Sequence, residues 1–233
     1  MKIITNHKLI KRNKKIGQVA TFTSLGVLVI GLLITFFRKE EIFWSIGALA
    51  LGFIISQVGI YYGKHWGPSP RQDELLATAL KGLDDKYTLY NYTSPIPYLL
   101  VGPSGINPLI PLNQGGIIRY NTKKKRFTQK GGNAYMKFFG QEGIGNPQVD
   151  ASANCESITN FLKENLKEAN FPAPEPILVF TNPKVTLELA DAPYTGVISE
   201  KLKDVIRKKA KANPTSLDTI EKIKTLMVQE DIV

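Results

Sequence analysis

The side chains with the most obvious capacity for covalent chemistry are one cysteine and two histidines. Cys155 could act as a nucleophile if a histidine lay close enough to take its proton. His7 and His65 flank the two long apolar segments described below, whereas Cys155 lies in a segment with helical periodicity. We therefore interpret Cys155 as a structural cysteine, and His65 as a residue at the level of lipid headgroups. A single cysteine also excludes a disulfide within the chain.

Carboxylate pairs and a glycine-rich stretch are the next candidates. Asp73-Glu74 and Asp84-Asp85 are adjacent in sequence, and adjacent side chains point apart in a helix or a strand, so we interpret both pairs as solvated. Residues 140–145 are rich in glycine but match neither a dinucleotide-binding loop nor a P-loop, which favours a connector. No HExxH, CxxC or EF-hand spacing occurs, so the sequence predicts no catalytic residue, no metal and no cofactor.

The clearest positively charged feature is a cluster around one predicted turn. Its members are Arg119, Lys123, Lys124, Lys125, Arg126 and Lys130. Such a cluster could contact the phosphates of a nucleic acid or anionic lipid headgroups, or it could be a solvated turn. A second basic run, within residues 201–211, also suits the negative end of a helix dipole.

Two uncharged segments dominate the first quarter of the chain. Residues 16–37 and 42–63 each contain 22 residues without a charged side chain. At ~1.5 Å per residue each would form a helix of about 33 Å, enough to cross a hydrocarbon core of about 30 Å. Four residues connect them, so the sequence predicts an antiparallel transmembrane hairpin over residues 16–63. A cleaved signal peptide and a buried soluble hairpin are the alternatives, and both fit the lengths less well.

The second apolar segment also contains a stripe of small residues. Ala48, Gly52 and Ser56 recur every four residues and therefore share a helix face on which a neighbouring helix could pack closely. We expect the lipid bilayer to surround the hairpin and helix–helix association to use this stripe.

The distribution of basic residues predicts the orientation. Residues 1–15 contain six Lys and Arg and no acidic residue, whereas the four-residue connection contains two. Because Lys and Arg favour the cytoplasmic side, we expect an integral membrane protein with two spans. The basic N-terminus (residues 1–15) and the C-terminal domain are then both cytoplasmic, which agrees with one free cysteine. The basic N-terminus also suits an anionic leaflet surface.

The net charge of +10 at first favours a nucleic-acid partner. Residues 1–63 hold eight Lys and Arg and two Glu, a net +6, and residues 64–233 hold 22 basic and 18 acidic residues, a net +4. More than half of the excess therefore belongs to the predicted membrane segment, which weakens the case for nucleic acid. An apolar fraction of 43% excludes wholesale disorder.

Residues 64–72 contain Gly67-Pro68-Ser69-Pro70 and are expected to form a linker to one cytoplasmic domain over residues 73–233. Periodicity predicts helices over residues 73–83, 147–169, 199–211 and 216–228. Strands are predicted over residues 87–93, 98–101, 116–121, 126–129, 135–139 and 177–180. Residues 106–112 are expected to form a poor or edge strand, because Pro108 and Pro111 lack backbone donors. This order predicts an α/β (α+β) fold.

Several segments resemble, in order and spacing, the nuclease-related domain (NERD) family. They are LLVGPSGI at 99–106, Asn113 with Gly116 and Ile118, Asn146-Pro147 before a long helix, and ILVFTNP at 177–183. The resemblance runs from about Asp73 to Arg207. It implies a restriction-endonuclease-like fold, with a mixed central sheet flanked by helices and here preceded by the transmembrane hairpin.

The resemblance also implies where a metal site would lie. The family's presumed site uses an Asp before the glycine turn and Glu-x-Lys in the next strand, where the acids hold Mg²⁺. In this chain the Asp position falls at Pro97, the Glu position at Ile110 and the Lys position at Leu112. A glutamine that is common in the family's long helix falls at Asp150. Residues 95–112 contain no Asp, Glu, Lys or Arg, so shifting the alignment by one residue restores nothing. The resemblance therefore implies a degenerate relative that is not an enzyme.

Three hypotheses follow. The first is a membrane-anchored, non-catalytic module that binds an unidentified protein or acts as a scaffold at the cytoplasmic face. The second is nucleic-acid binding without cleavage, which requires the basic cluster to be contiguous with a cleft. The third is an active metal-dependent nuclease with a relocated site, which requires carboxylates such as Asp73, Glu74 and Asp150 to converge.

Overall fold

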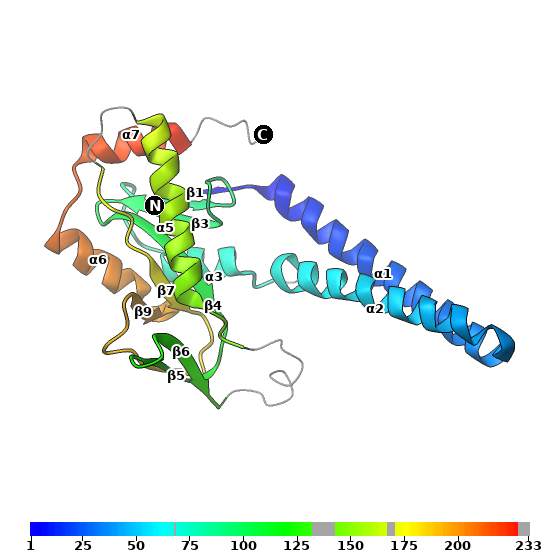
Figure 1. Cartoon of the computed structure of the whole chain (residues 1–233). Helices are drawn as coiled ribbons and strands as arrows, with labels where there is room; N and C mark the ends of the chain where they lie inside the picture. Colours follow the sequence, from blue (N-terminus) through cyan, green and yellow to red (C-terminus); the bar gives the residue numbers. More distant parts are fainter. Residues whose placement is uncertain (68, 132–142, 167–170, 228–233) are drawn as a thin grey trace. The chain divides into compact units, whose positions relative to one another are not determined.

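A computed structural model describes residues 1–67, 69–131, 143–166 and 171–227. The chain divides into two compact units, one of residues Asn6–Arg71 and one that combines Met1–Thr5 with Gln72–Val233 (Figure 1). The strand predicted over residues 135–139 and the first half of the glycine-rich stretch 140–145 lie outside the described residues.

Helices α1 (His7–Phe37) and α2 (Ile42–Trp66) form the first unit, joined by the short 3₁₀ helix η1 (Lys39–Glu41) (Figure 1). Both helices are long and apolar enough to cross a membrane. Helix α1 begins at His7 rather than at residue 16, because the side chain of Asn6 caps it by accepting a hydrogen bond from the backbone N–H of Leu9 (2.8 Å). The basic residues after His7 are themselves good helix formers, so the helix extends beyond its apolar segment.

Small residues seven positions apart lie between the two helices. They are Gly17, Ser24 and Gly31 in α1, and Ser45, Gly52 and Gly59 in α2. A Cβ atom added at Gly52 would lie 2.7 Å from Cγ of Leu28, so the helices approach closely there. The hydroxyl of Ser45 donates a hydrogen bond to the carbonyl of Gly31 (2.8 Å), which links the helices near their connection at η1.

The stripe of Ala48, Gly52 and Ser56 packs largely within this hairpin. Gly52 is buried, and a Cβ atom added at Gly31 would lie 3.2 Å from Cβ of Ala48. Ser56 is half-buried and donates a hydrogen bond to the carbonyl of Phe53 (2.7 Å). The neighbouring helix on this face is therefore α1 of the same chain.

A six-stranded mixed sheet forms the centre of the second unit, in the order β1-β2-β3-β4-β7-β9. The strands are β1 (Lys2–Thr5), β2 (Thr88–Asn91), β3 (Tyr98–Gly102), β4 (Gly105–Leu112), β7 (Ile177–Phe180) and β9 (Thr195–Ile198). Strand β3 runs antiparallel to both neighbours, whereas the pairs β1–β2, β4–β7 and β7–β9 are parallel. A separate three-stranded sheet has the order β6-β5-β8, from β6 (Arg126–Lys130), β5 (Gly116–Asn121) and β8 (Val185–Glu188).

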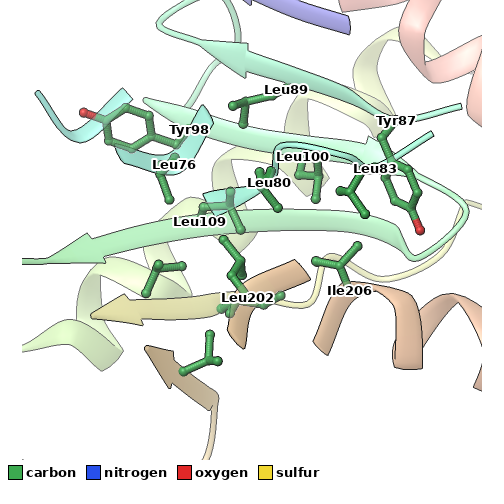
Figure 2. Packing of buried hydrophobic residues seen from close by; sticks show 13 residues of the cluster. Leu76, Leu80, Leu83, Tyr87, Leu89, Tyr98, Leu100, Leu109, Leu202 and Ile206 are labelled. Carbon is green, nitrogen blue, oxygen red and sulfur yellow. The ribbon is translucent and has the colours of Figure 1, made fainter. Parts of the chain in front are cut away.

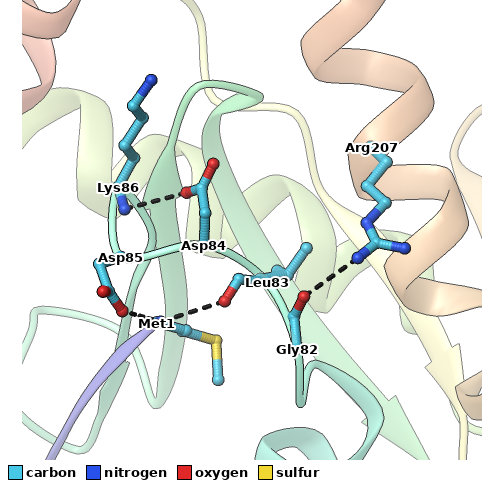
Figure 3. A network of polar contacts seen from close by, with 7 residues as sticks. All are labelled: Met1, Gly82, Leu83, Asp84, Asp85, Lys86 and Arg207. Carbon is cyan, nitrogen blue, oxygen red and sulfur yellow. Dashed lines mark hydrogen bonds and ion pairs between the residues drawn. The ribbon is translucent and has the colours of Figure 1, made fainter.

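Strand β1 was not predicted, because four residues are too few to show a periodic pattern. It pairs in parallel with β2, with Lys2 opposite Thr88 and Thr5 opposite Asn91. The α-amino group of Met1 donates hydrogen bonds to the carbonyl of Leu83 (3.1 Å) and to the carboxylate of Asp85 (2.7 Å) (Figure 3). The hydrogen bond and the positive charge lower the pKa of the Asp85 carboxyl. Residues before and after the hairpin thus belong to one folded unit.

The expectation that residues 106–112 form a poor or edge strand is wrong, because β4 lies inside the sheet between β3 and β7. The carbonyls of Ile106 and Leu112 accept hydrogen bonds from the backbone N–H groups of Glu175 and Thr181. The backbone N–H and C=O groups of even-numbered residues of β4 therefore point toward β7, and those of odd-numbered residues point toward β3. Pro108 is even-numbered but precedes the first residue paired with β7, Leu109. Pro111 is odd-numbered but lies beyond Pro108, the last residue paired with β3. Neither proline therefore removes a donor from the ladders.

Helices cover both faces of the large sheet. They are α3 (Gln72–Ala79), α5 (Pro147–Asn165), α6 (Leu202–Ala212) with the preceding η2 (Ser199–Lys201), and α7 (Leu217–Met227). Leu76 of α3 and Leu202 of α6 pack with Leu109 of β4 on one face (Figure 2). Ile158 of α5 and Ile220 of α7 pack on the other face. The four predicted helices are confirmed with shorter bounds, and the fold is mixed α/β.

Gly102 offers a direct test of the β3–β4 turn. A Cβ atom there would collide with the buried ring of Tyr87, 2.7 Å from Cε1. We expect Gly102→Ala to lower the free energy of unfolding by about 1–3 kcal/mol, because the ring has no free volume into which to move. The measurement is the thermal midpoint of the full chain in detergent, followed by circular dichroism. Gly143→Ala is the control, because nothing lies within 4 Å of an added Cβ there, and equal midpoints would contradict the described packing.

Candidate functional site

Two of the four positions that the NERD resemblance assigns to a former metal site are buried in a hydrophobic cluster. Ile110 and Leu112, at the end of β4, are 6% and 8% exposed. They pack with Phe180 of β7, Ala151 of α5, and Ile118 and Phe127 of the smaller sheet. Hydrocarbon side chains cannot coordinate a hard cation. The space beside this end of β4 is therefore filled by the smaller sheet.

The other two positions lie outside this cluster. Pro97 is exposed just before β3, and its carbonyl accepts a hydrogen bond from the N–H of Tyr92 (2.8 Å). Extending the register of Leu99 with Pro108 by two residues would place Pro97 beside Ile110, but the ladder ends before that point. Asp150 is exposed in the first turn of α5. The structure thus brings Ile110 and Leu112 together and leaves Pro97 and Asp150 exposed.

The carboxylates of the relocated-site hypothesis do not come together. Asp73 and Glu74 belong to α3, which packs through Leu76 against the face of the sheet that carries Leu109. Asp73 is 4% exposed, so the interpretation of this pair as solvated is wrong for Asp73. Asp150 belongs to α5, which packs through Ala151 against the face that carries Ile110. Successive residues of a strand point to opposite faces, so the two helices lie on opposite sides of the sheet. Within the described residues, no group of three or more His, Cys, Asp or Glu could hold a metal ion.

Arg119 differs from the other members of the basic cluster, because its charge is compensated. Its guanidinium pairs with the carboxylate of Glu188 on the adjacent strand β8, with Nη2 3.0 Å from Oε1. The hydrogen bond and the opposite charge lower the pKa of the Glu188 carboxyl and raise the pKa of the Arg119 guanidinium. Arg119 is thus an ion-pair partner across strands, and its possible contact with a phosphate or a lipid headgroup stays a prediction.

The turn between β5 and β6 presents a concentrated positive charge. Lys123, Lys124, Lys125 and Arg126 are all exposed, as is Lys130 at the end of β6. Asn121 shapes the turn by accepting a hydrogen bond from the N–H of Lys124 (2.9 Å), and Lys125 has a left-handed φ of 46°. No acidic residue in the described part of the chain pairs with these side chains.

A hollow of about 300 Å³ adjoins this turn and is lined by residues of β5, of α5, of the turn itself and of the loop before β9. The lining includes Tyr120, Lys125, Gln148, Val149, Ser152 and Tyr194. Nε2 of Gln148 donates a hydrogen bond to the carbonyl of Lys125 (2.6 Å), which connects the first turn of α5 to the turn of the β5–β6 hairpin. Its Oε1 is buried and has no hydrogen-bond partner among the described residues. We call the turn residues Lys123–Arg126 and this hollow the hairpin-tip surface.

Sequence reasoning found the basic half of the hairpin-tip surface and missed the aromatic half. Tyr120, Val149 and Tyr194 come from segments far apart in the chain, and no spacing in the sequence links them. Val149 is 56% exposed although it stands in the first turn of α5.

Cys155 has the surroundings of a structural thiol. It is half-buried on α5, with Sγ 3.6 Å from the carbonyl oxygen of Pro174. Burial raises the pKa of the thiol, which disfavours the reactive thiolate. Both histidines, His7 and His65, belong to the hairpin unit rather than to the unit of Cys155.

No family model, curated protein or solved structure matches this chain. The function must therefore be inferred from the geometry of the chain itself. Two features bear on it most directly: the apolar filling at Ile110 and Leu112, and the hairpin-tip surface.

Replacing Ile110 by Glu tests whether its position is a closed core or an open site. We expect Ile110→Glu to cost at least about 3 kcal/mol of stability, because a carboxylate would enter the cluster without a partner. That loss corresponds to a fall of about 6–12 °C in the thermal midpoint of the full chain in detergent. Val149→Glu, at an exposed position near the same cluster, is the control and should shift the midpoint little. A stable Ile110→Glu variant would mean that the position is open to solvent.

Proposed function

We propose that this chain is a membrane-anchored, NERD-like binding module without nuclease activity, held at the cytoplasmic face of the membrane. One observation carries the proposal. At the end of β4, where the resemblance expects a metal-binding Glu and its Lys, Ile110 and Leu112 are packed into the core. A module that keeps the fold and fills the reaction site with hydrocarbon is suited to binding rather than to cutting.

The hairpin supports the membrane anchor. Two adjacent helices pass the length and hydropathy requirements for a span, and their outward surfaces carry large exposed apolar residues such as Phe22, Leu25 and Phe53. Strand β1 precedes the hairpin and pairs with β2, which follows it. Both ends of the hairpin must therefore lie on one side of the membrane, a requirement that two spans meet and one span cannot. The six basic residues within the first fifteen favour the cytoplasm for that side.

The architecture agrees with the resemblance. A mixed sheet with helices on both faces is the arrangement that a restriction-endonuclease-like fold implies. The quoted segments also fall at corresponding places: the Gly102–Gly105 turn joins β3 and β4, Pro147 opens α5, and Ile177–Phe180 forms β7. These correspondences support the NERD-like assignment as the best account of the sequence and the fold together.

The hairpin-tip surface is the part of the module best suited to a protein partner. Tyr120, Tyr194 and Arg126 are of the residue types enriched at protein interfaces, and the neighbouring lysines would complement acidic groups of a partner. The buried, unpaired Oε1 of Gln148 adds an acceptor that a partner's donor could satisfy. We therefore assign the contact with an unidentified cytoplasmic protein to this surface.

The test combines a nuclease assay with crosslinking. The purified full chain, supplied with Mg²⁺ or Mn²⁺, is expected to leave DNA and RNA uncut. A photoreactive residue at Thr122, in the turn, should give a discrete protein adduct in the chain's own membranes. The same group at Lys211, on α6, is the matched control and should not. Metal-dependent cleavage that survives purification would contradict the non-catalytic assignment, and identical adducts from both positions would contradict the assigned surface.

A second candidate function, nucleic-acid binding without cleavage, is favoured by one specific observation. The uncompensated charges of Lys123–Arg126 are contiguous with a hollow that contains Tyr120 and Tyr194. Surfaces that bind single-stranded nucleic acid usually combine cations, which contact the phosphate backbone, with aromatic rings on which the bases stack.

The salt dependence of binding separates this candidate from the first. If single-stranded RNA or DNA binds through the turn, its affinity for the full chain should fall steeply as salt rises, by about 0.7 logarithmic units per neutralised phosphate per tenfold change in salt. Changing Lys123, Lys124 and Lys125 to Gln should reduce that slope by about two units. Changing three other exposed lysines, Lys201 of η2 with Lys208 and Lys211 of α6, is the charge-matched control. Affinity that is indifferent to salt would exclude phosphate-driven binding.

A further inference from the structure

The open end of the membrane hairpin carries a concentrated positive charge on ordered helix. The residues are Lys8, Lys11, Arg12, Lys14 and Lys15, and we call them the basic collar. All five side chains are exposed, whereas Ile10 and Asn13 between them are buried. The sequence alone placed these cations in an N-terminal segment before the first span. The structure places them on the first turns of α1, continuous with the apolar part of that helix.

Four of the five members of the basic collar point away from the second helix. At 100° per residue, Lys8, Lys11, Arg12 and Lys15 fall within an arc of about 100°. That arc is centred opposite Gly17, which lies against Tyr62 of α2, and opposite the buried residues Ile10 and Asn13. These four cations therefore face whatever surrounds the hairpin rather than α2.

An aromatic belt fixes the level of the basic collar along the hairpin. A Cβ atom added at Gly17 would lie 2.9 Å from Cβ of Tyr62, so Gly17 and Tyr62 are level. Tyr61 is 58% exposed and contacts both Tyr62 and His65, with ring centroids 5.5 and 4.5 Å apart. Exposed tyrosines on a membrane helix mark the boundary between hydrocarbon and headgroups.

The distances along the helix match the thickness of a headgroup layer. The basic collar lies two to nine residues beyond Gly17, which is about 3–14 Å along the axis. The headgroup region occupies about 5–8 Å on each side of a bilayer. Arg12, Lys14 and Lys15, at about 3–8 Å, therefore fall within the headgroup layer, whereas Lys11 at about 9 Å lies at its outer edge and Lys8 at about 14 Å lies beyond it.

The charges of the hairpin are strongly asymmetric. Neither α1 nor α2 contains an acidic residue, so nothing within these helices neutralises the basic collar. At the opposite end, Arg38 pairs with Glu41 (2.9 Å), and Glu40 offsets Lys39 in the connection. One end of the hairpin is thus neutral and the other is strongly basic, which is the complement of a membrane whose leaflet on that side is anionic.

We propose that the basic collar binds anionic phospholipid headgroups and keeps them enriched around the open end of the hairpin. The inference rests on the membrane anchoring proposed above and adds the lipid class that this anchor selects. Each Lys or Arg near an anionic surface attracts it, and five on one short stretch act together. The attraction is additional to the hydrophobic insertion of the helices, which does not distinguish one headgroup from another.

Tryptophan quenching provides the test, because Trp66 stands one turn beyond Tyr62 on α2, beside the basic collar. The chain has two tryptophans, so Trp44→Phe leaves Trp66 as the only one. This full-length variant is reconstituted into symmetric vesicles that contain phosphatidylcholine and phosphatidylglycerol, with one or the other brominated near the headgroup. We expect the quenching of Trp66 by brominated phosphatidylglycerol to correspond to a local fraction of this lipid about threefold or more above its bulk fraction. This enrichment should decrease as added salt screens the attraction.

Two charge-matched variants locate the effect. Changing all five collar residues to Gln should lower the ratio of local to bulk phosphatidylglycerol to about one. Changing Lys123, Lys124, Lys125, Arg126 and Lys130 to Gln should leave this ratio unchanged. Equal quenching by both lipids, or loss of enrichment only in the second variant, would overturn the proposal. Flotation of every variant with pure phosphatidylcholine vesicles tests insertion separately. If the unmodified chain fails to float, the membrane anchor and the lipid selection both fall; if it floats without enrichment, the lipid selection alone falls.

Discussion

Burial of β4 on both of its faces is the constraint on which the rest of the sheet-containing unit depends. This strand lies inside the six-stranded sheet, and its side chains alternate between the core beneath α3 and α6 and the core beneath α5 and the smaller sheet. Every position from Leu109 to Leu112 therefore requires an apolar residue. An enzyme that placed Glu and Lys here would forgo packing in exchange for chemistry. This chain continues the core instead, and the smaller sheet packs upon it.

The comparison of sequence with structure separates strong signals from weak ones. The pair of long apolar helices, the buried strand Ile177–Phe180 and the β5–β6 hairpin could be predicted, because long apolar runs and turn-flanked alternation are local properties. Strand β4 was predicted as a poor or edge strand because Pro108 and Pro111 lack backbone donors. Whether those donors are needed depends on the register of β4 with both neighbouring strands, which the sequence does not show. Strands β8 and β9 are four residues each and show too little pattern to be found. The aromatic half of the hairpin-tip surface arises only when distant segments converge.

The hairpin itself is built for close and regular contact. Glycine and serine at seven-residue intervals in both helices match the repeat of a left-handed supercoil, so the same small side chains stay at the interface along its length. Hydroxyls within the interface bond to backbone carbonyls, as Ser45 does to Gly31 and Thr21 does to Gly17. Such packing leaves the large apolar side chains facing outward, where lipid would meet them.

The position of β1 in the chain has a consequence for the order of assembly. β1 precedes both long apolar helices in the chain, yet its partner β2 lies 86 residues later, beyond them. At about 5–20 residues per second, the ribosome needs roughly 4–17 s to produce that partner. During this interval β1 has no partner strand with which to pair. Completion of the sheet therefore follows the synthesis of both apolar helices, so that the finished sheet joins the segments before and after the hairpin.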